Sequence, residues 1–271
     1  MTASGIPVAI GSLGSIGARV AKGIVAEISG FNLVAASARD MAAAKAKLEA
    51  IGSDARLVPL DRLAEDADIV IECAPVAVFR DIAVPAIEAG RTFVPASVAG
   101  LLFNPDLIAR AAETGARIIV PTGAIAGLDA VRAAAKGRID SAALITRKPP
   151  KSLSGAPGLA GMDYDPDSLT EPLRVFEGDT LEAARAFPAN VNVAAALALA
   201  GIGPESTRVE IWADPAAVRN THTIRIESDA MRLDLAIEAL PSVENPKSST
   251  LTPLSILAAL ESLVTPVRVG S

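Results

Sequence analysis

The sequence predicts an α/β protein of two domains, one with a doubly wound parallel sheet and one with an open, largely antiparallel sheet. Over the first 120 residues, continuous apolar runs alternate with segments of helical periodicity, as in a parallel sheet covered by helices on both faces. Later in the chain, three segments alternate strictly between apolar and polar residues, which is typical of an antiparallel sheet with one solvated face. We place the first domain at residues 1–122 and 248–271, and the second at 123–247.

The first domain is expected to hold strands and helices in alternation. Its strands are predicted at residues 8–10, 31–36, 68–72, 92–96 and 118–120. Its helices are predicted from the glycine-spaced turn to Ile28 and over residues 41–51, 81–89 and 105–114. Pro85 is compatible with the third of these helices only near its start. Thr252 as N-cap and Pro253 at the first helical position predict a last helix to Val264, packed on this domain.

The pattern changes after Gly123. We expect a helix with Ile125, Leu128 and Val131 on one face that ends at Gly137, a strand over 142–146, a polar loop over 148–166 and a helix over 190–200. The alternating strands follow at 208–213, 222–227 and 231–238, and residues 228–230 predict a hairpin between the last two.

Composition and charge argue against several classes of function. The 271 residues carry a net charge of −6 without a basic block, which disfavours a nucleic-acid surface. Cys73 is the only cysteine, so an internal disulfide is impossible, as fits a reducing cytoplasm. No basic-then-apolar leader opens the chain, and no apolar stretch reaches the roughly 20 residues that span a bilayer. We therefore expect a soluble cytoplasmic protein without nucleic-acid or membrane partners.

The turn after the first strand has the spacing of a dinucleotide site. The residues expected to contact a cofactor there are Ser12, Leu13, Gly14, Ser15, Ile16 and Gly17. Glycine lets the backbone approach a pyrophosphate, and the first turn of the following helix directs free N–H groups at the anion. The motif departs from G-x-G-x-x-G because Ser12 stands at the first glycine. The alternative is a plain strand–turn–helix; the context favours a Rossmann-type domain that binds NAD or NADP.

The end of the second strand bears on the choice of cofactor. NAD sites usually place an acidic residue there, about 20 residues after the glycines, to bind the ribose 2′-hydroxyl. This chain has Ser37 and Arg39, which favour a 2′-phosphate and hence NADP, although Arg39 as a solvated loop residue is the alternative. Cys73 follows a buried strand where the chain passes the cofactor, and with Ala74 and Ser97 it is expected to contact it. A buried cysteine is more often an apolar filler than a nucleophile.

His222 is the only histidine and the candidate catalytic residue. It shares strand parity with Ile224 and Ile226, so it points to the covered face of its strand. It also follows a polar turn, which places it at the rim of the sheet. Its ordinary pKa lies near neutrality, as a proton-transfer step requires. A structural or surface histidine is the alternative.

Arg147 and Lys148 end a strand beside a loop and are candidates to hold a substrate carboxylate, with exposed charge as the alternative. No cluster of metal-ligand residues is evident, so we expect no metal. Ser97 and Ser154 have no base near them in sequence, which disfavours a hydrolase triad.

A set of short segments, taken in order, resembles the L-aspartate dehydrogenases over nearly the whole chain. They are Ala-Ser-Val-Ala-Gly at 96–100, Pro-Thr-Gly-Ala-Ile-Ala-Gly at 121–127, Thr-Arg-Lys-Pro at 146–149, Phe-Pro-Ala-Asn-Val-Asn at 187–192, Ala-Asp-Pro at 213–215, Asn-Thr-His at 220–222 and Glu-Asn-Pro-Lys at 244–247. The resemblance implies a Rossmann domain joined to an α/β domain, NAD or NADP as cofactor, and a homodimer. It also implies that His222 is catalytic and that Ala124 and Asn190 contact the cofactor.

The resemblance implies reversible oxidative deamination of L-aspartate, through iminosuccinate to oxaloacetate and ammonia. His222 is then the general base for water, and Lys148, Arg147 or Asn192 binds the substrate carboxylates. The chain departs from the family's pattern at Ser12, at Ala189 where lysine is common, and at Pro75-Val76 where Gly-His is common. These departures keep open an imine or oxo-acid reductase or a dehydrogenase of another amino acid. A non-catalytic NADP-sensing protein is the third alternative.

Overall fold

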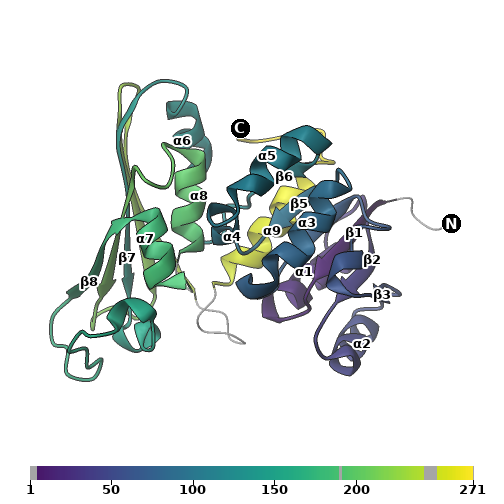
Figure 1. Ribbon diagram of the computed structural model, residues 1–271, viewed down its shortest axis with the longest axis horizontal. Helices are drawn as coiled ribbons and strands as arrows, with labels where there is room; N and C mark the ends of the chain where they lie inside the picture. Colours follow the sequence, from purple (N-terminus) through teal and green to yellow (C-terminus); the bar gives the residue numbers. More distant parts are fainter. Residues whose placement is uncertain (1–4, 189–190, 241–248, 271) are drawn as a thin grey trace. The chain divides into compact units, whose positions relative to one another are not determined.

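The computed structural model describes residues 5–188, 191–240 and 249–270. The chain folds into two compact units (Figure 1). Unit 1 comprises residues 1–121 and 252–268, and unit 2 comprises residues 122–251 and 269–271. Each unit is built on a sheet of its own.

Unit 1 contains a six-stranded sheet in the order β3-β2-β1-β4-β5-β6, and every neighbouring pair is parallel. Its strands are β1 (Ile6–Gly11), β2 (Phe31–Ser37), β3 (Arg56–Leu57), β4 (Ile69–Glu72), β5 (Thr92–Pro95) and β6 (Arg117–Ile118). The strand order reverses between β1 and β4, and open α/β sheets bind ligands at the carboxyl ends of the strands beside such a switch point. The predicted Rossmann-type sheet is confirmed.

Helices cover both faces of this sheet, as predicted. They are α1 (Ser15–Ala26), α2 (Met41–Ala50), α3 (Phe79–Glu88), α4 (Ala99–Leu102), α5 (Pro105–Thr114) and α9 (Leu251–Glu261). One core joins Ile24 of α1 and Ile256 of α9 to Ile10 of the sheet. The other core joins Ile82 of α3 and Leu107 of α5 to the opposite face. The last helix, yellow in Figure 1, thus packs in unit 1 as expected.

Three details of unit 1 differ from the sequence predictions. β3 was not predicted, because a strand of only two residues has no recognisable apolar run. α3 begins at Phe79, so Pro85 lies in its interior and not near its start. The helix tolerates this proline because Phe79, Ile82 and other apolar residues of α3 are buried, and packing outweighs one missing hydrogen bond. α9 begins at Leu251, whose N–H donates to Ser249 Oγ at 3.0 Å, so Thr252 lies inside the helix and is not its N-cap.

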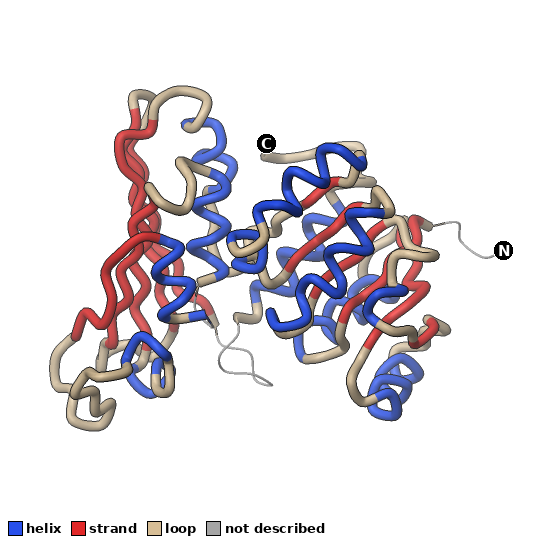
Figure 2. The backbone as a smooth tube through the Cα atoms, in the orientation of Figure 1, coloured by secondary structure: helices blue, strands red, loops and turns tan. Residues whose placement is uncertain are grey.

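Unit 2 contains a five-stranded sheet in the order β11-β10-β7-β9-β8. The strands are β7 (Ile139–Lys148), β8 (Leu173–Asp179), β9 (Thr207–Ala213), β10 (Asn220–Ser228) and β11 (Arg232–Ala239). The pair β7–β9 is parallel and the other three pairs are antiparallel, which confirms the largely antiparallel sheet. The helices α6 (Leu128–Ala134), α7 (Thr180–Ala186) and α8 (Asn192–Ala200) lie along one face of these strands (Figure 2).

The alternating pattern sets which face of this sheet is covered. Val209 and Ile211 of β9 and Ile224 of β10 are buried, whereas Arg208 and Arg225, one position away, are exposed. The hairpin at residues 228–230 is also confirmed, because the Ser228 N–H donates to the Met231 carbonyl at 3.0 Å.

Some elements of unit 2 were missed or misplaced. β8 was not predicted because a bulge between Arg174 and Phe176 breaks its alternation. α7 was not predicted, although a capping box of Asp179 and Glu182 precedes it and is a sequence signal for a helix start. The helix expected around Ile125 begins only at Leu128, after Gly127 with φ of 76°. The expected polar loop after β7 contains two short 3-10 turns, at Pro150–Leu153 and Pro157–Leu159. Among the described helices, none has the length and apolar character needed to span a bilayer.

Candidate active site

The turn between β1 and α1 has a strained backbone at the place where glycine was expected. Ser12 has φ of 88°, and it is the only non-glycine residue among those described that has a positive φ. Its N–H donates to the Ser37 carbonyl of β2 at 3.0 Å, which holds the turn against the sheet. Side chains disfavour this conformation, so Ser12 adopts the backbone shape of the missing glycine at a cost in strain.

Gly17 lets α1 approach the turn closely. A Cβ atom on residue 17 would lie 2.0 Å from the Ser12 carbonyl oxygen and 3.3 Å from Cys73 Cβ. Gly14 is exposed at the N-cap of α1, and within the described residues no side chain caps this helix. The amide donors of its first turn are therefore available to an anion. Lys47 Nζ of α2 donates to the Leu13 carbonyl at 2.8 Å and supports the turn from the other side.

These features fit a dinucleotide pyrophosphate. The cradle is one that a Cβ would fill, and its donors belong to Gly14, Ser15 and Ile16, whereas Leu13 is buried and anchors the turn. Ser37 is buried at the end of β2, and Arg39 beyond it is exposed. The carboxylate of Asp40 accepts from the Ala43 N–H at 3.0 Å as the N-cap of α2.

A buried carboxylate joins the carboxyl ends of β4 and β5, and the sequence analysis missed it. Glu72 is fully buried, its Oε1 accepts from the Ala74 N–H at 2.7 Å and its Oε2 accepts from the Ser97 N–H at 2.9 Å. The Ser97 hydroxyl lies 3.1 Å from Oε1 as well. Burial raises the pKa of Glu72 to about 7, although these hydrogen bonds oppose the rise. An acidic residue that ends an entirely apolar parallel strand was the available signal.

Cys73, beside Glu72, carries an inert thiol. Burial, followed by the charge of Glu72, raises the pKa of this thiol well above its ordinary value. The thiol therefore stays protonated and is a poor nucleophile. Its backbone N–H donates to the Gly11 carbonyl at 2.9 Å, which brings the ends of β1 and β4 together.

In unit 2, the side chains of Thr146, Lys148 and His222 lie on the covered face of the sheet. His222 of β10 pairs in register with Thr146 of β7, and its Nδ1 lies 3.0 Å from Thr146 Oγ1. Lys148 is two residues further along β7 on the same face. His222 and Lys148 are each 5% exposed. The structure therefore brings together two of the residues that the sequence singled out, and adds Thr146, which it did not.

Burial shifts the pKa values of both ionisable side chains in this group. Burial, and after it the charge of Lys148, lower the pKa of His222 to about 3. Burial lowers the pKa of Lys148 to about 8. The imidazole is therefore neutral at physiological pH and able to accept a proton, next to a cation that attracts an anionic ligand.

The other predicted substrate and cofactor residues of unit 2 come from three different segments. Arg147 is on the opposite face of β7, where its guanidinium contacts Asp214 at 3.3 Å and the Trp212 ring at 4.8 Å. Asn192 is the exposed first residue of α8, and Ala124 is buried in the segment before α6. Asn190 lies outside the described residues.

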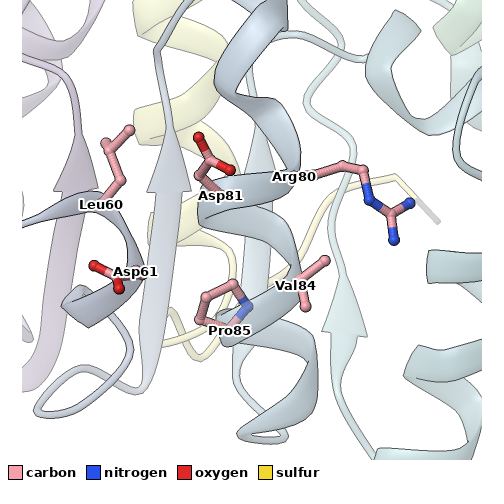
Figure 3. A pocket seen from close by; sticks show the side chains of 6 residues that line it. All are labelled: Leu60, Asp61, Arg80, Asp81, Val84 and Pro85. Carbon is pink, nitrogen blue, oxygen red and sulfur yellow. The ribbon is translucent and has the colours of Figure 1, made fainter.

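A surface groove on unit 1 involves none of the predicted residues. It lies between a 3-10 turn at Leu60–Arg62 and α3, and Figure 3 shows Asp61 and Asp81 on its two sides. Arg80 at its edge pairs with Asp106 at 2.9 Å. Within the described ranges, no group of three or more His, Cys, Asp or Glu side chains is arranged to hold a metal.

Comparisons with known proteins agree with both units. Residues 129–263 match the family described as aspartate dehydrogenase, C-terminal, and residues 13–121 match the NAD binding domain of homoserine dehydrogenase. The chain is 48% identical to L-aspartate dehydrogenase 3 of Bordetella bronchiseptica over 97% of each chain. It is 47% identical to an L-aspartate dehydrogenase of Bradyrhizobium diazoefficiens, over 99% of this chain and 95% of the relative. The chain belongs to the L-aspartate dehydrogenase family.

Solved structures support the same assignment. Aspartate dehydrogenase from Thermotoga maritima superposes with a TM-score of 0.73 at 27% identity, over 98% of this chain and 99% of that one. A scyllo-inositol dehydrogenase from Lactobacillus casei shares the fold alone, with a TM-score of 0.56 at 17% identity, over 98% of this chain and 91% of that one. The predicted family and the predicted dinucleotide-binding domain are confirmed.

Alanine substitutions at the two glycines of the turn should affect stability and cofactor affinity differently. Gly17→Ala places a methyl group against the Ser12 carbonyl, so the protein should lose both thermal stability and affinity for NAD(P)H. Gly14→Ala meets only Ser12 Oγ at 3.8 Å, so it should change the unfolding free energy by only about 1 kcal/mol. It should nevertheless weaken cofactor binding at least tenfold, because its methyl group occupies the pyrophosphate's place. Denaturant unfolding and NAD(P)H fluorescence titration measure both; unchanged affinity in Gly14→Ala contradicts the assignment.

Glu72 should make folding depend on pH. Its pKa is raised in the folded state, so the folded protein binds a proton more tightly than the unfolded chain does, and stability falls as pH rises from about 4.5 to about 7. The loss from this one group is up to about 3 kcal/mol. Urea unfolding at a series of pH values should therefore show a difference between wild type and Glu72→Gln that changes over this range. Parallel profiles would rule out the raised pKa.

Proposed function

We propose that this protein catalyses the reversible NAD(P)-dependent oxidative deamination of L-aspartate to oxaloacetate and ammonia through iminosuccinate. Relatives that are 47–48% identical over almost the whole chain carry the name L-aspartate dehydrogenase, which supports this substrate. The observation that carries the proposal is the buried group of His222, Thr146 and Lys148. It combines a neutral base with a cation, as the deamination of a dicarboxylic amino acid requires.

His222 is the proposed proton carrier. The bound cofactor supplies the acceptor for the hydride that leaves the substrate Cα. When a water oxygen bonds to the carbon of the protonated imine, one water proton passes to His222 Nε2, with Nδ1–H donated to Thr146 Oγ1. The imidazolium then gives this proton to the amine, and as the carbon–nitrogen bond breaks, the new hydroxyl group loses its remaining proton to solvent and becomes the carbonyl. Burial is the larger cause of the low pKa of His222, and the charge of Lys148 is the smaller one; a bound dicarboxylate offsets the charge of Lys148 and thereby raises this pKa.

Lys148 is the proposed partner of a substrate carboxylate. It is buried on the face that carries His222, whereas Arg147 contacts Asp214 and Trp212 on the other face. A desolvated ammonium binds an anion more strongly than an exposed one does. Asn192, at the start of α8, is the proposed second contact.

The cofactor preference, contacts and assembly are also proposals. We propose a preference for NADP because Asp40 serves as a helix cap and Arg39 is exposed at the end of β2. The proposed further contacts to the cofactor are Cys73, Ala74, Ser97, Ala124 and Asn190. A cytoplasmic homodimer is proposed from the family resemblance.

A dehydrogenase of another amino acid, or an imine reductase, is the second candidate. Val76 is 49% exposed directly after Ala74 and Pro75, where family members commonly carry a Gly-His pair. A screen of amino acids with NAD and NADP, read by absorbance of the reduced nicotinamide, separates the two. Preference for L-aspartate over every other amino acid supports the proposal, and faster turnover of another amino acid overturns it.

Replacement of His222 tests the proton-transfer role. His222→Ala should lower kcat by about 10²- to 10⁴-fold, because the step loses its general base. The affinity for NAD(P)H should stay within about twofold, since the turn that binds pyrophosphate lies in unit 1. Steady-state kinetics and fluorescence titration measure the two quantities. Wild-type turnover in this variant removes the imidazole from the mechanism.

Lys148 and Arg147 provide a matched pair of variants. Lys148→Met should raise KM for L-aspartate at least tenfold, because the buried cation that binds the carboxylate is lost. Arg147→Met removes the adjacent charge on the other face and should leave KM within about twofold. If the two variants respond in the opposite order, Lys148 is not the carboxylate's partner.

Arg39 tests the cofactor preference. Arg39→Ala should weaken NADPH binding about tenfold and leave NADH binding unchanged, because the guanidinium contacts only the 2′-phosphate. Lys45→Ala removes an exposed charge of α2 that pairs with Glu49 and serves as the control. Equal effects of Arg39→Ala on both cofactors would exclude this role.

A further inference from the structure

Glu72 has no part in the mechanism above, yet it is the fully buried carboxylate at the carboxyl edge of the unit 1 sheet. Burial of a charge without partners is costly, so a carboxylate at such a position needs donors. Glu72 has donors from two different turns, the one after β4 and the one after β5. The two turns contain Cys73, Ala74 and Ser97, three of the proposed cofactor contacts.

We propose that Glu72 is a positioning residue that ties the turns after β4 and β5 into one support for the nicotinamide half of the cofactor. The inference rests on the proposed cofactor contacts. In a doubly wound sheet each half binds one mononucleotide, and the glycine turn with β2 belongs to the half that binds the adenosine moiety. The turns after β4 and β5 belong to the other half.

The hydrogen bonds define how this link works. Both oxygens of Glu72 accept a backbone N–H, Oε1 from Ala74 and Oε2 from Ser97. The Ser97 hydroxyl has one hydrogen but lies 3.1 Å from two acceptors, Glu72 Oε1 and the Ala74 carbonyl. With Glu72 ionised, the hydroxyl donates to one of these. With Glu72 protonated on Oε1, the carboxyl donates to Ser97 Oγ and the hydroxyl donates to the Ala74 carbonyl. The turns stay joined in either state.

The neighbours of Glu72 in the sheet are uncharged. Its register partners are Gly11 of β1 and Pro95 of β5, and the nearby helix α4 contains no charged residue. The adjacent titratable group is the Cys73 thiol, which stays neutral. Glu72→Gln keeps the shape but replaces one acceptor oxygen with an NH₂ group. That group must face the N–H of either Ala74 or Ser97, so one turn loses its bond.

The test compares a whole cofactor with its adenosine half. Glu72→Gln should raise the Kd of NADH and NADPH at least tenfold and leave the Kd of ADP and 2′,5′-ADP within twofold, as measured by isothermal titration calorimetry. Asp68→Asn is the control. Asp68, beside the amino end of β4, pairs with Arg91, and its loss should change neither affinity.

The outcomes separate the two proposals. Wild type that binds neither dinucleotide overturns the proposed function. Wild type that binds, with Glu72→Gln binding NADH and NADPH equally well, overturns the role of Glu72. Equal weakening of dinucleotide and adenosine half also overturns it, because Glu72 then serves the unit as a whole.

If Glu72→Gln does not fold, NMR spectroscopy of the wild-type protein tests the same link. The backbone amide resonances of Ala74 and Ser97 should titrate together with one pKa near 7, since one carboxyl accepts from both. Both should shift on addition of NADH and neither on addition of ADP. Amides that titrate separately, or that respond to ADP as they do to NADH, contradict the link.

Discussion

A Cβ atom on residue 17 would lie 2.0 Å from the Ser12 carbonyl oxygen, and this close approach governs the nucleotide-binding half of the protein. It lets α1 begin directly behind β1, so that the amides of its first turn converge where a pyrophosphate can bind. In the same turn Ser12 has φ of 88°. The bonds to Ser37 and from Lys47 to Leu13 then hold a turn that its own sequence does not favour.

Ionisable groups that are buried or partly buried lie at the proposed functional positions of both units. Glu72 and Cys73 lie at the carboxyl edge of the first sheet, and His222 and Lys148 lie on the covered face of the second. In each case burial is the largest cause of the pKa shift, and it favours the neutral form. Such groups cost folding free energy, and sites of proton transfer and ligand binding are where proteins commonly retain them.

Elements with a regular apolar period can be predicted from the sequence, whereas features that depend on one irregular residue cannot. Continuous apolar strands and the alternation around Ile224 follow from periodicity alone, so both sheets were predictable. β8 escaped because its bulge breaks the period. Thr146 and Lys148 were within reach, because extending the parity of Leu144 along β7 puts both on the covered face with His222. Glu72 was harder to find, since its role depends on two backbone amides that only the folded turns bring to it.

A crystal structure of the protein with NADP⁺ and succinate, a non-reacting analogue of L-aspartate, would show directly where cofactor and substrate bind. We expect the pyrophosphate on the amides of residues 14–16, one succinate carboxylate on Lys148 Nζ, and His222 Nε2 within about 4 Å of the dicarboxylate. A pyrophosphate bound away from the glycine turn, or succinate out of reach of both Lys148 and His222, would contradict this expectation.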